Sequence, residues 1–166
     1  MSRVIIFLII GLKTVSGQTF TGQVYQLAES FLEEKCSVNP ECDCCSNDLI
    51  FLSDKEFALI TRCIYNDSYF TGTYVSTADK LILTFKPSVV NEIVDEETKE
   101  INNQKKKSEI KPITFRVSDC GQNRLRLEYD HMDGKDFKNG TRHSPTKEKE
   151  IIERLKRTPA WKMLTN

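Results

Sequence analysis

The sequence has no excess of charge of either sign and very little histidine. It also has no long apolar run beyond the one near its N-terminus. Its 24 basic and 24 acidic residues balance, and a chain without a concentrated basic face is not typical of a general nucleic-acid-binding protein. The two histidines, His131 and His143, lie in polar segments expected to form exposed loops, and no Ser-His-Asp or Cys-His order accompanies them. We therefore expect a protein that is not an enzyme and uses no cofactor.

The N-terminal segment has the features of a secretory signal peptide. Arg3 precedes an apolar run over residues 4–12, and the small residues at 15–17 offer a cleavage site before Gln18. The run is too short to span a bilayer as a helix, and no cysteine follows the cleavage point to carry a bacterial lipid anchor. A buried N-terminal strand is the alternative.

We predict a signal peptide at 1–17 and a single mature domain at 18–166. We expect this domain to be secreted or periplasmic, with no stable membrane insertion after cleavage, because no second hydrophobic span follows.

All six cysteines follow the signal segment: Cys36, Cys42, Cys44, Cys45, Cys63 and Cys120. An even number of cysteines in an exported chain indicates disulfides, but sequence alone cannot choose among the possible pairings. The alternative is a site for copper(I) or zinc, whose soft thiolate ligands would be the clustered cysteines, Cys36, Cys42, Cys44 and Cys45. Their spacing fits no standard zinc pattern, so disulfides are favoured.

Alternating apolar residues predict antiparallel strands along most of the chain. The expected strands cover residues 49–53, 57–65, 70–75, 80–86, 113–117 and 125–129. If the first hairpin turns at residues 54–55, Ser46 lies opposite Cys63 and a diagonal Cys44–Cys63 bridge is plausible. A one-residue slip would substitute Cys45.

A helix is expected near each end of the chain. Apolar residues at helical spacing indicate an amphipathic helix at 22–34. Ser144 followed by Pro145 resembles an N-cap and first helical position, which predicts a helix at 145–157. Thr158 and Pro159 should end this helix, and Trp161, Met163 and Leu164 should form an apolar tail that folds back on the barrel.

Between the expected strands, residues 87–111 form an exposed insertion, either a long loop or a ragged hairpin. It carries the lysine run 105–107, which is either a polyanion contact or a solvated surface. The fold class is thus mainly β: a small antiparallel up-and-down meander or barrel with a helix near each end.

The segment from Leu49 to Phe85 resembles a known family of small barrels. The resemblance rests on residues 54–57 (DKEF), 71–74 (TGTY) and 77–84 (TADKLILT). They are similar to the lipocalin-like barrels of the bacterial envelope, among them the amino-terminal domain of the copper-responsive lipoprotein NlpE and small secreted Bacteroidetes proteins. The resemblance implies a lipocalin-like fold. It does not imply copper sensing, because the anchoring cysteine and the family's cysteine pair are both missing.

Two weaker motifs lie in segments expected to be loops. Acceptor patterns for glycosylation occur at Asn66 and Asn139, and they would matter only in a eukaryotic protein. A short acidic segment around Gly134 faintly resembles a calcium loop, but its register fails and a turn explains it better. Its acidic residues are Asp130, Asp133 and Asp136.

Three functions remain open. The first is an exported, non-enzymatic barrel that binds a small apolar ligand or a partner protein. The second is an envelope metal-binding or stress-sensing protein that uses the cysteine cluster at 36–45. The third is an extracellular inhibitor whose disulfides brace a presented loop such as 87–111.

Overall fold

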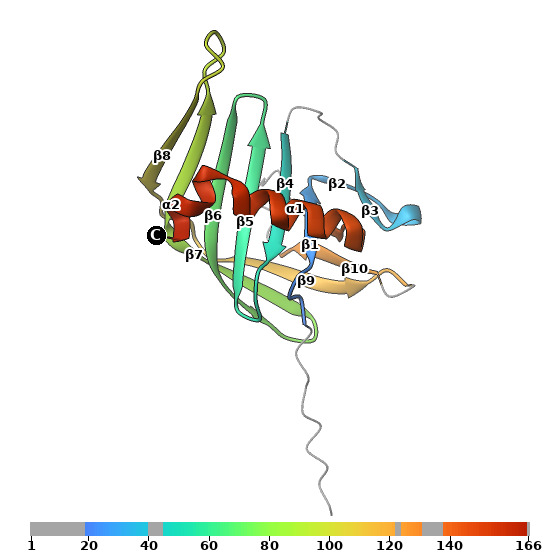
Figure 1. The fold of residues 1–166 in the computed structure, drawn as a ribbon. Helices are drawn as coiled ribbons and strands as arrows, with labels where there is room; N and C mark the ends of the chain where they lie inside the picture. The colour runs from blue at the N-terminus through green and yellow to red at the C-terminus, as the bar shows by residue number, and fades with distance from the viewer. Residues whose placement is uncertain (1–18, 40–44, 122–123, 131–137, 166) are drawn as a thin grey trace, which may run out of the picture.

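The chain folds into a closed barrel of eight antiparallel strands. A computed structural model describes residues 19–39, 45–121, 124–130 and 138–165. Each barrel strand pairs with the next one along the chain, and the last pairs with the first, so the order is that of an up-and-down meander. The barrel strands are β1 (Val24–Ala28), β4 (Cys45–Phe51), β5 (Glu56–Cys63), β6 (Asn66–Ser76), β7 (Lys80–Val94), β9 (Ile113–Asp119), β10 (Leu125–Tyr129) and β11 (Asn139–Arg142). The expected fold class is therefore confirmed for the barrel (Figure 1).

The helix expected at 22–34 is wrong. This segment forms β1, the short strand β2 (Ser30–Leu32) and the 3₁₀ turn η1 (Glu33–Lys35); β2 then pairs with β3 (Ser37–Asn39) in a separate two-stranded sheet. In β1, Tyr25 and Leu27 face the barrel interior while Val24 packs beneath the C-terminal helices. A strand buried on both faces places apolar residues at consecutive positions, and here that pattern imitated helical spacing.

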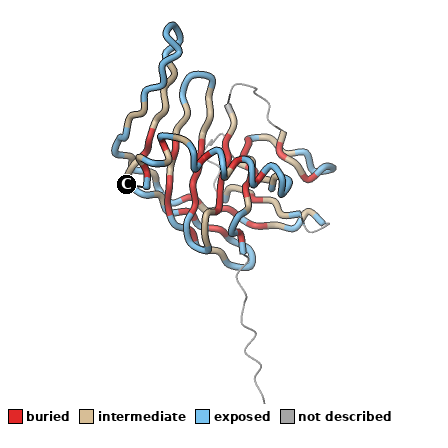
Figure 2. The backbone as a smooth tube through the Cα atoms, viewed as in Figure 1, coloured by how far each residue is buried: buried red, intermediate tan, exposed pale blue. Residues whose placement is uncertain are grey.

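The insertion at 87–111 is a long hairpin. β7 continues past the barrel to Val94 and pairs there with β8 (Ile101–Lys107). At the tip, the carboxylate of Asp95 accepts hydrogen bonds from the backbone N–H groups of Glu97 and Thr98 at 3.0 and 2.7 Å. These bonds lower the pKa of Asp95. Figure 2 shows the exposed tip projecting beyond the buried body of the sheet.

Two C-terminal helices cover the outer face of the barrel. The helix expected at 145–157 is present as α1 (Pro145–Arg157), and the apolar tail forms α2 (Pro159–Thr165), which contacts β6, β7 and β8. Ile151 and Leu155 of α1 pack on the outward side chains of the strands beneath, such as Ile50 and Ile60. Glu148 anchors the start of α1: its carboxylate accepts the backbone N–H of Val24 at 3.0 Å.

The lower half of the barrel interior, toward the end at which β6 ends and β7 begins, is filled by aromatic side chains. The ring of Phe20, which precedes β1, lies 4.8 Å from that of Phe51 and 6.2 Å from that of Tyr74, centroid to centroid. All three residues are buried. Gly72 allows β6 to pack tightly here, because a Cβ at this position would lie 2.1 Å from the carbonyl oxygen of Thr84.

No helix among the described residues is long and apolar enough to cross a membrane. The expected signal peptide at 1–17 lies outside the described part of the chain.

Candidate functional site

The upper end of the barrel interior carries aromatic side chains that are only partly buried. We define the upper end as the one at which β5 ends at Cys63 and β6 begins at Asn66 (Figure 1). Phe70, Phe85 and Tyr129 face the interior there and are only partly buried. The Phe85 ring lies 6.1 Å from that of Phe70. The upper interior therefore presents aromatic surface that the described side chains do not fully cover.

Asn47 adds a polar group to this apolar surface. It shares the inward face of β4 with Leu49 and Phe51, and it lies opposite Leu27 and Thr61 in the neighbouring strands. The residue is 7% exposed, and its side-chain oxygen Oδ1 has no hydrogen-bond partner among the described residues. A buried acceptor without a donor is destabilising, so a donor brought by a bound molecule would be favourable here.

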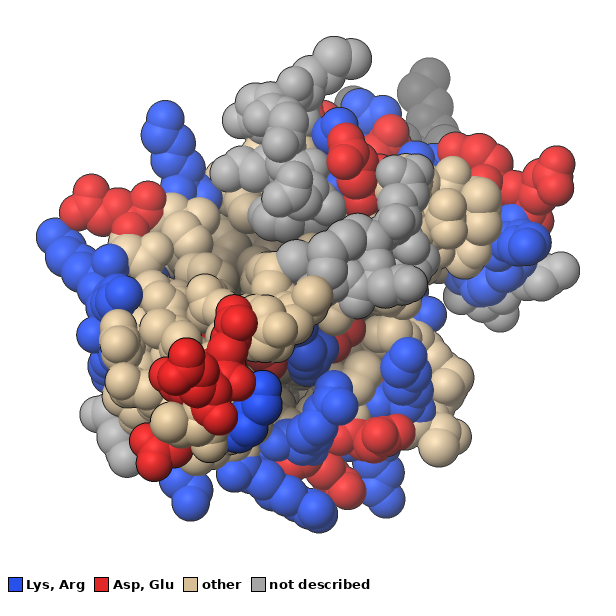
Figure 3. Space-filling model, turned by 90° about the horizontal axis from the view of Figure 1, so that it is seen from above, with Lys and Arg blue, Asp and Glu red and all other residues tan. Residues whose placement is uncertain are grey.

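The face of the molecule that includes the upper end of the barrel carries both signs of charge. Figure 3, which looks at the molecule from above, shows acidic and basic side chains interspersed around uncharged ones.

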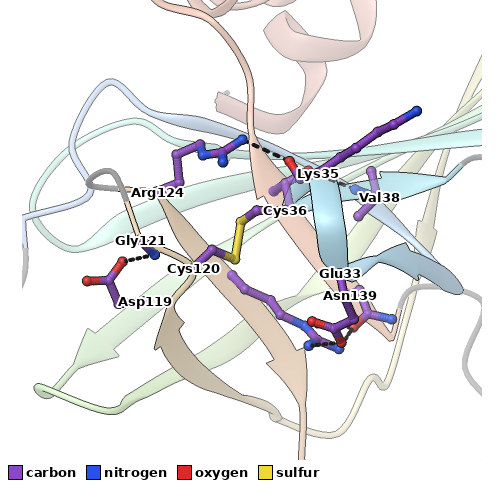
Figure 4. Close-up of a disulfide and its surroundings, with 11 residues drawn as sticks. Glu33, Lys35, Cys36, Val38, Asp119, Cys120, Gly121, Arg124 and Asn139 are labelled. Atoms are coloured by element: carbon purple, nitrogen blue, oxygen red, sulfur yellow. Dashed lines mark hydrogen bonds and ion pairs between the residues drawn. A yellow bond between two sulfur atoms is a disulfide. The ribbon is translucent and has the colours of Figure 1, made fainter.

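A disulfide braces the outside of the barrel. Cys36, which follows η1, is bonded to Cys120 at the end of β9 (Figure 4). Beside it, the Arg124 guanidinium donates to the Lys35 carbonyl oxygen at 2.8 Å. Cys36 has a left-handed backbone, with φ 43°. The bridge and this hydrogen bond fix the β2–β3 hairpin to the turn that joins β9 to β10.

Arg126 of β10 continues this brace. Its guanidinium lies 3.9 Å from the centre of the Phe31 ring and donates to the Glu33 carboxylate at 2.8 Å. It also donates to the side-chain oxygen of Asn139, whose amide nitrogen donates in turn to the Glu29 carbonyl oxygen at 2.7 Å. The loop expected at Asn139 is therefore wrong: this residue is buried in β11. Its amide nitrogen has no room for a glycan in this fold.

Asn66 differs from Asn139. It is exposed at the start of β6, so it lies at a strand end rather than within a loop.

The remaining cysteines are only partly described. Cys63 is disulfide-bonded. The backbone register places Cys45 opposite Cys63, and Ser46 opposite Arg62, so the expected pairing of Ser46 with Cys63 is wrong by one residue. The hairpin turn is centred one half-residue earlier than the sequence suggested. Cys42 and Cys44 lie outside the described residues.

The metal alternative loses one of its four ligands, because Cys36 is held in a disulfide and has no free thiolate. In the described ranges no cluster of three or more histidine, cysteine or acidic residues is arranged to hold a metal ion. Asp130, the described member of the weak calcium motif, faces the Arg116 guanidinium at 3.5 Å. Asp133, Gly134 and Asp136 lie outside the described residues.

The side chain of His143 is only 9% exposed, contrary to the exposed loop position expected for it. Its Nε2 lies 3.1 Å from Oδ1 of Asp48, and Arg62 pairs with the other oxygen of the same carboxylate. Burial raises the pKa of Asp48, but the hydrogen bonds and charges of His143 and Arg62 outweigh it and lower the pKa. This network joins β4 and β5 to the segment that leads into α1. His131 lies outside the described residues.

Two carboxylates face each other on the outer surface near α1. Asp67 of β6 and Glu92 of β7 are directly opposite in register. Burial raises the pKa of both, and the charge of Asp67 adds to the effect on Glu92. With Arg62 and Arg154 they line a cavity of about 250 Å³. The sequence did not predict that these two carboxylates lie together, because Glu92 falls in the segment 87–111, which was expected to be an exposed insertion.

Comparison of the chain with family models, with curated proteins and with solved structures finds no match in any of the three. The function therefore has to be argued from the geometry above.

Proposed function

We propose that the protein is an exported, non-enzymatic barrel that takes a small, largely apolar ligand into its upper interior. Two observations carry the proposal: Asn47 faces the interior with a side-chain oxygen that has no hydrogen-bond partner among the described residues, and the rings of Phe70 and Phe85 face the same interior and are only partly buried. Small ligand sites are mostly apolar with a few well-placed polar groups, and eight-stranded barrels can hold one such molecule. The ligand should carry one hydrogen-bond donor for Asn47.

The dense packing of the lower interior supports a ligand site at the upper end of the barrel. The rings of Phe20, Phe51 and Tyr74 are packed against one another and buried. A ligand would thus rest on an aromatic floor that is already ordered, which reduces the entropy lost on binding. The disulfide brace also supports export, because structural disulfides form and persist in oxidising compartments.

A fluorescent probe tests the proposal. N-phenyl-1-naphthylamine is apolar, carries one N–H donor and gains fluorescence when it leaves water. We expect saturable binding with one site per chain. Phe70→Ala should weaken binding several-fold, because it removes aromatic contact area. Val75→Ala is the matched control: it lies on the same strand, is 64% exposed, and should leave binding unchanged.

The outcome against the proposal is an absence of saturable binding, or an equal effect of the two variants. The donor is tested separately with 1-decanol and methyl decyl ether as competitors of the probe. Wild-type protein should prefer the alcohol, whose hydroxyl can donate to Asn47, and Asn47→Leu should abolish that preference. An unchanged preference in the variant would remove Asn47 from the site.

A further inference from the structure

A second cavity lies outside the barrel, between α2 and the strands β5, β6 and β7. Its volume is about 160 Å³, far more than a single water molecule needs. The sole tryptophan, Trp161, lines it together with Leu52 and Leu164. Leu52, Trp161 and Leu164 belong to the outer core formed with the helices, whereas Phe57 and Gly72, which also line the cavity, belong to barrel strands.

Thr71 places an unsatisfied polar group in this cavity. It is 5% exposed and lines the cavity, and in the part of the chain that the structure describes its hydroxyl has no hydrogen-bond partner. It lies at the irregularity of the β6–β7 ladder, where the register shifts between Phe70 and Gly72. Bulges of this kind often re-aim a side chain next to a functional site. The bulge here leaves a buried hydroxyl that can donate to a bound acceptor.

The charges at the cavity favour an anion. Lys86 and Lys156 line it, and neither forms an ion pair with any described residue; one acidic residue, Glu56, lines it as well. Lysines are effective partners for carboxylates as point charges. The cavity thus combines apolar walls, a hydroxyl donor and an excess of positive charge.

We propose that this cavity binds a small apolar monocarboxylate. The carboxylate accepts a hydrogen bond from the Thr71 hydroxyl and is held by the ammonium groups of Lys86 and Lys156. The apolar part lies against Trp161 and Leu164. α2 forms one wall of the site, so binding also holds this short helix against β6 and β7. The proposal does not depend on a ligand in the barrel interior.

The single tryptophan provides the readout. Benzoate is the probe, titrated against the full chain while the fluorescence of Trp161 is recorded, and benzamide is the uncharged isostere. We expect a saturable change with benzoate and at least tenfold weaker binding of benzamide. Thr71→Val should weaken benzoate binding about tenfold, the loss of one charge-assisted hydrogen bond. Thr73→Val, on the same strand but exposed, should bind as wild type.

Lys86→Gln provides a second variant. It changes an exposed residue and leaves the buried Thr71 in place, and it should also weaken benzoate binding. Circular dichroism establishes that each variant is folded. Three results would overturn the proposal: no saturable change in Trp161 fluorescence, equal affinity for benzamide and benzoate, or unchanged benzoate affinity in both Thr71→Val and Lys86→Gln. Any of these would leave the cavity as a solvent-filled void under α2.

Discussion

Cys36 and Cys120 lie 84 residues apart in the sequence, yet their Cα atoms are 5.9 Å apart across a disulfide. The bond ties the β2–β3 hairpin to the far end of the barrel sheet, where β9 turns into β10 (Figure 4). Because the loop that it closes is long, much of its effect should come from restricting the unfolded chain.

Removing this bridge should lower stability without changing the fold. We expect the double variant Cys36→Ala/Cys120→Ala to lose about 2–4 kcal/mol in free energy of unfolding. Urea unfolding followed by circular dichroism measures this loss. Ser118→Ala, on the same strand, is the control and should unfold at nearly the wild-type midpoint. An unchanged midpoint in the double variant would mean that the hydrogen bonds of the brace suffice without the covalent link.

The opposed carboxylates Asp67 and Glu92 should make the protein more stable when one of them is neutral. Both have raised pKa values, so the folded state binds protons more tightly than the unfolded state. Stability should therefore fall as the pH rises from the ordinary carboxyl range through the raised pKa values. Glu92→Gln should raise the melting temperature slightly at pH 7, with the advantage shrinking toward pH 4. Glu96→Gln, at an exposed position, is the control. An equal rise in its melting temperature would argue against repulsion between Asp67 and Glu92.

Asp48 should behave in the opposite way. Its pKa is lowered in the folded state, so its contribution is present above the ordinary carboxyl range and is lost as the pH falls through the lowered value. Asp48→Asn leaves Arg62 and His143 without their shared carboxylate, and we expect a loss of about 3 kcal/mol at pH 7. Chemical unfolding at pH 7 and at pH 3 measures both effects. A loss that is the same at both pH values would contradict this account of the network.

Gly72 is required by close packing. A Cβ there would meet both the Thr84 carbonyl oxygen and the Phe57 ring, at 2.1 and 2.7 Å. We expect Gly72→Ala to destabilise the barrel by at least about 2 kcal/mol. Gly121→Ala serves as the comparison, because that glycine has open space but a positive φ of 83°, and it should cost only about 1 kcal/mol. Thermal unfolding of both variants distinguishes crowding from backbone strain. Equal losses would contradict the crowding argument.

The barrel was predictable from sequence where one face of each strand is polar. Residues 113–117 and 125–129 alternate cleanly, and both segments are strands. The first strand was not predictable, since α1 lies against Val24 on its outer face and an apolar residue at that position interrupts the alternation. The helix α1 was found from Ser144 and Pro145 because the signals of a helix start are local to the chain; proline occupies the first turn as expected, although the Ser144 side chain makes no capping hydrogen bond.

The candidate sites were less accessible from sequence than the fold. Asn47 and Thr71 are ordinary polar residues in their local sequence, and only the closed barrel and the packed helix leave their oxygen atoms buried without partners. The cysteine pairing depended on a register that differs by one residue from the expected one. Such features depend on contacts between distant segments, which periodicity does not specify.

The most direct test of ligand binding in the barrel is methyl NMR with N-phenyl-1-naphthylamine. Leu27 and Leu59 face the interior near Asn47, whereas Leu155 and Leu164 lie in the outer core beneath the helices. We predict that saturating probe shifts the methyl signals of Leu27 and Leu59 and leaves those of Leu155 and Leu164 in place. Shifts confined to Leu155 and Leu164, or no shifts at all, would contradict a ligand site in the upper interior.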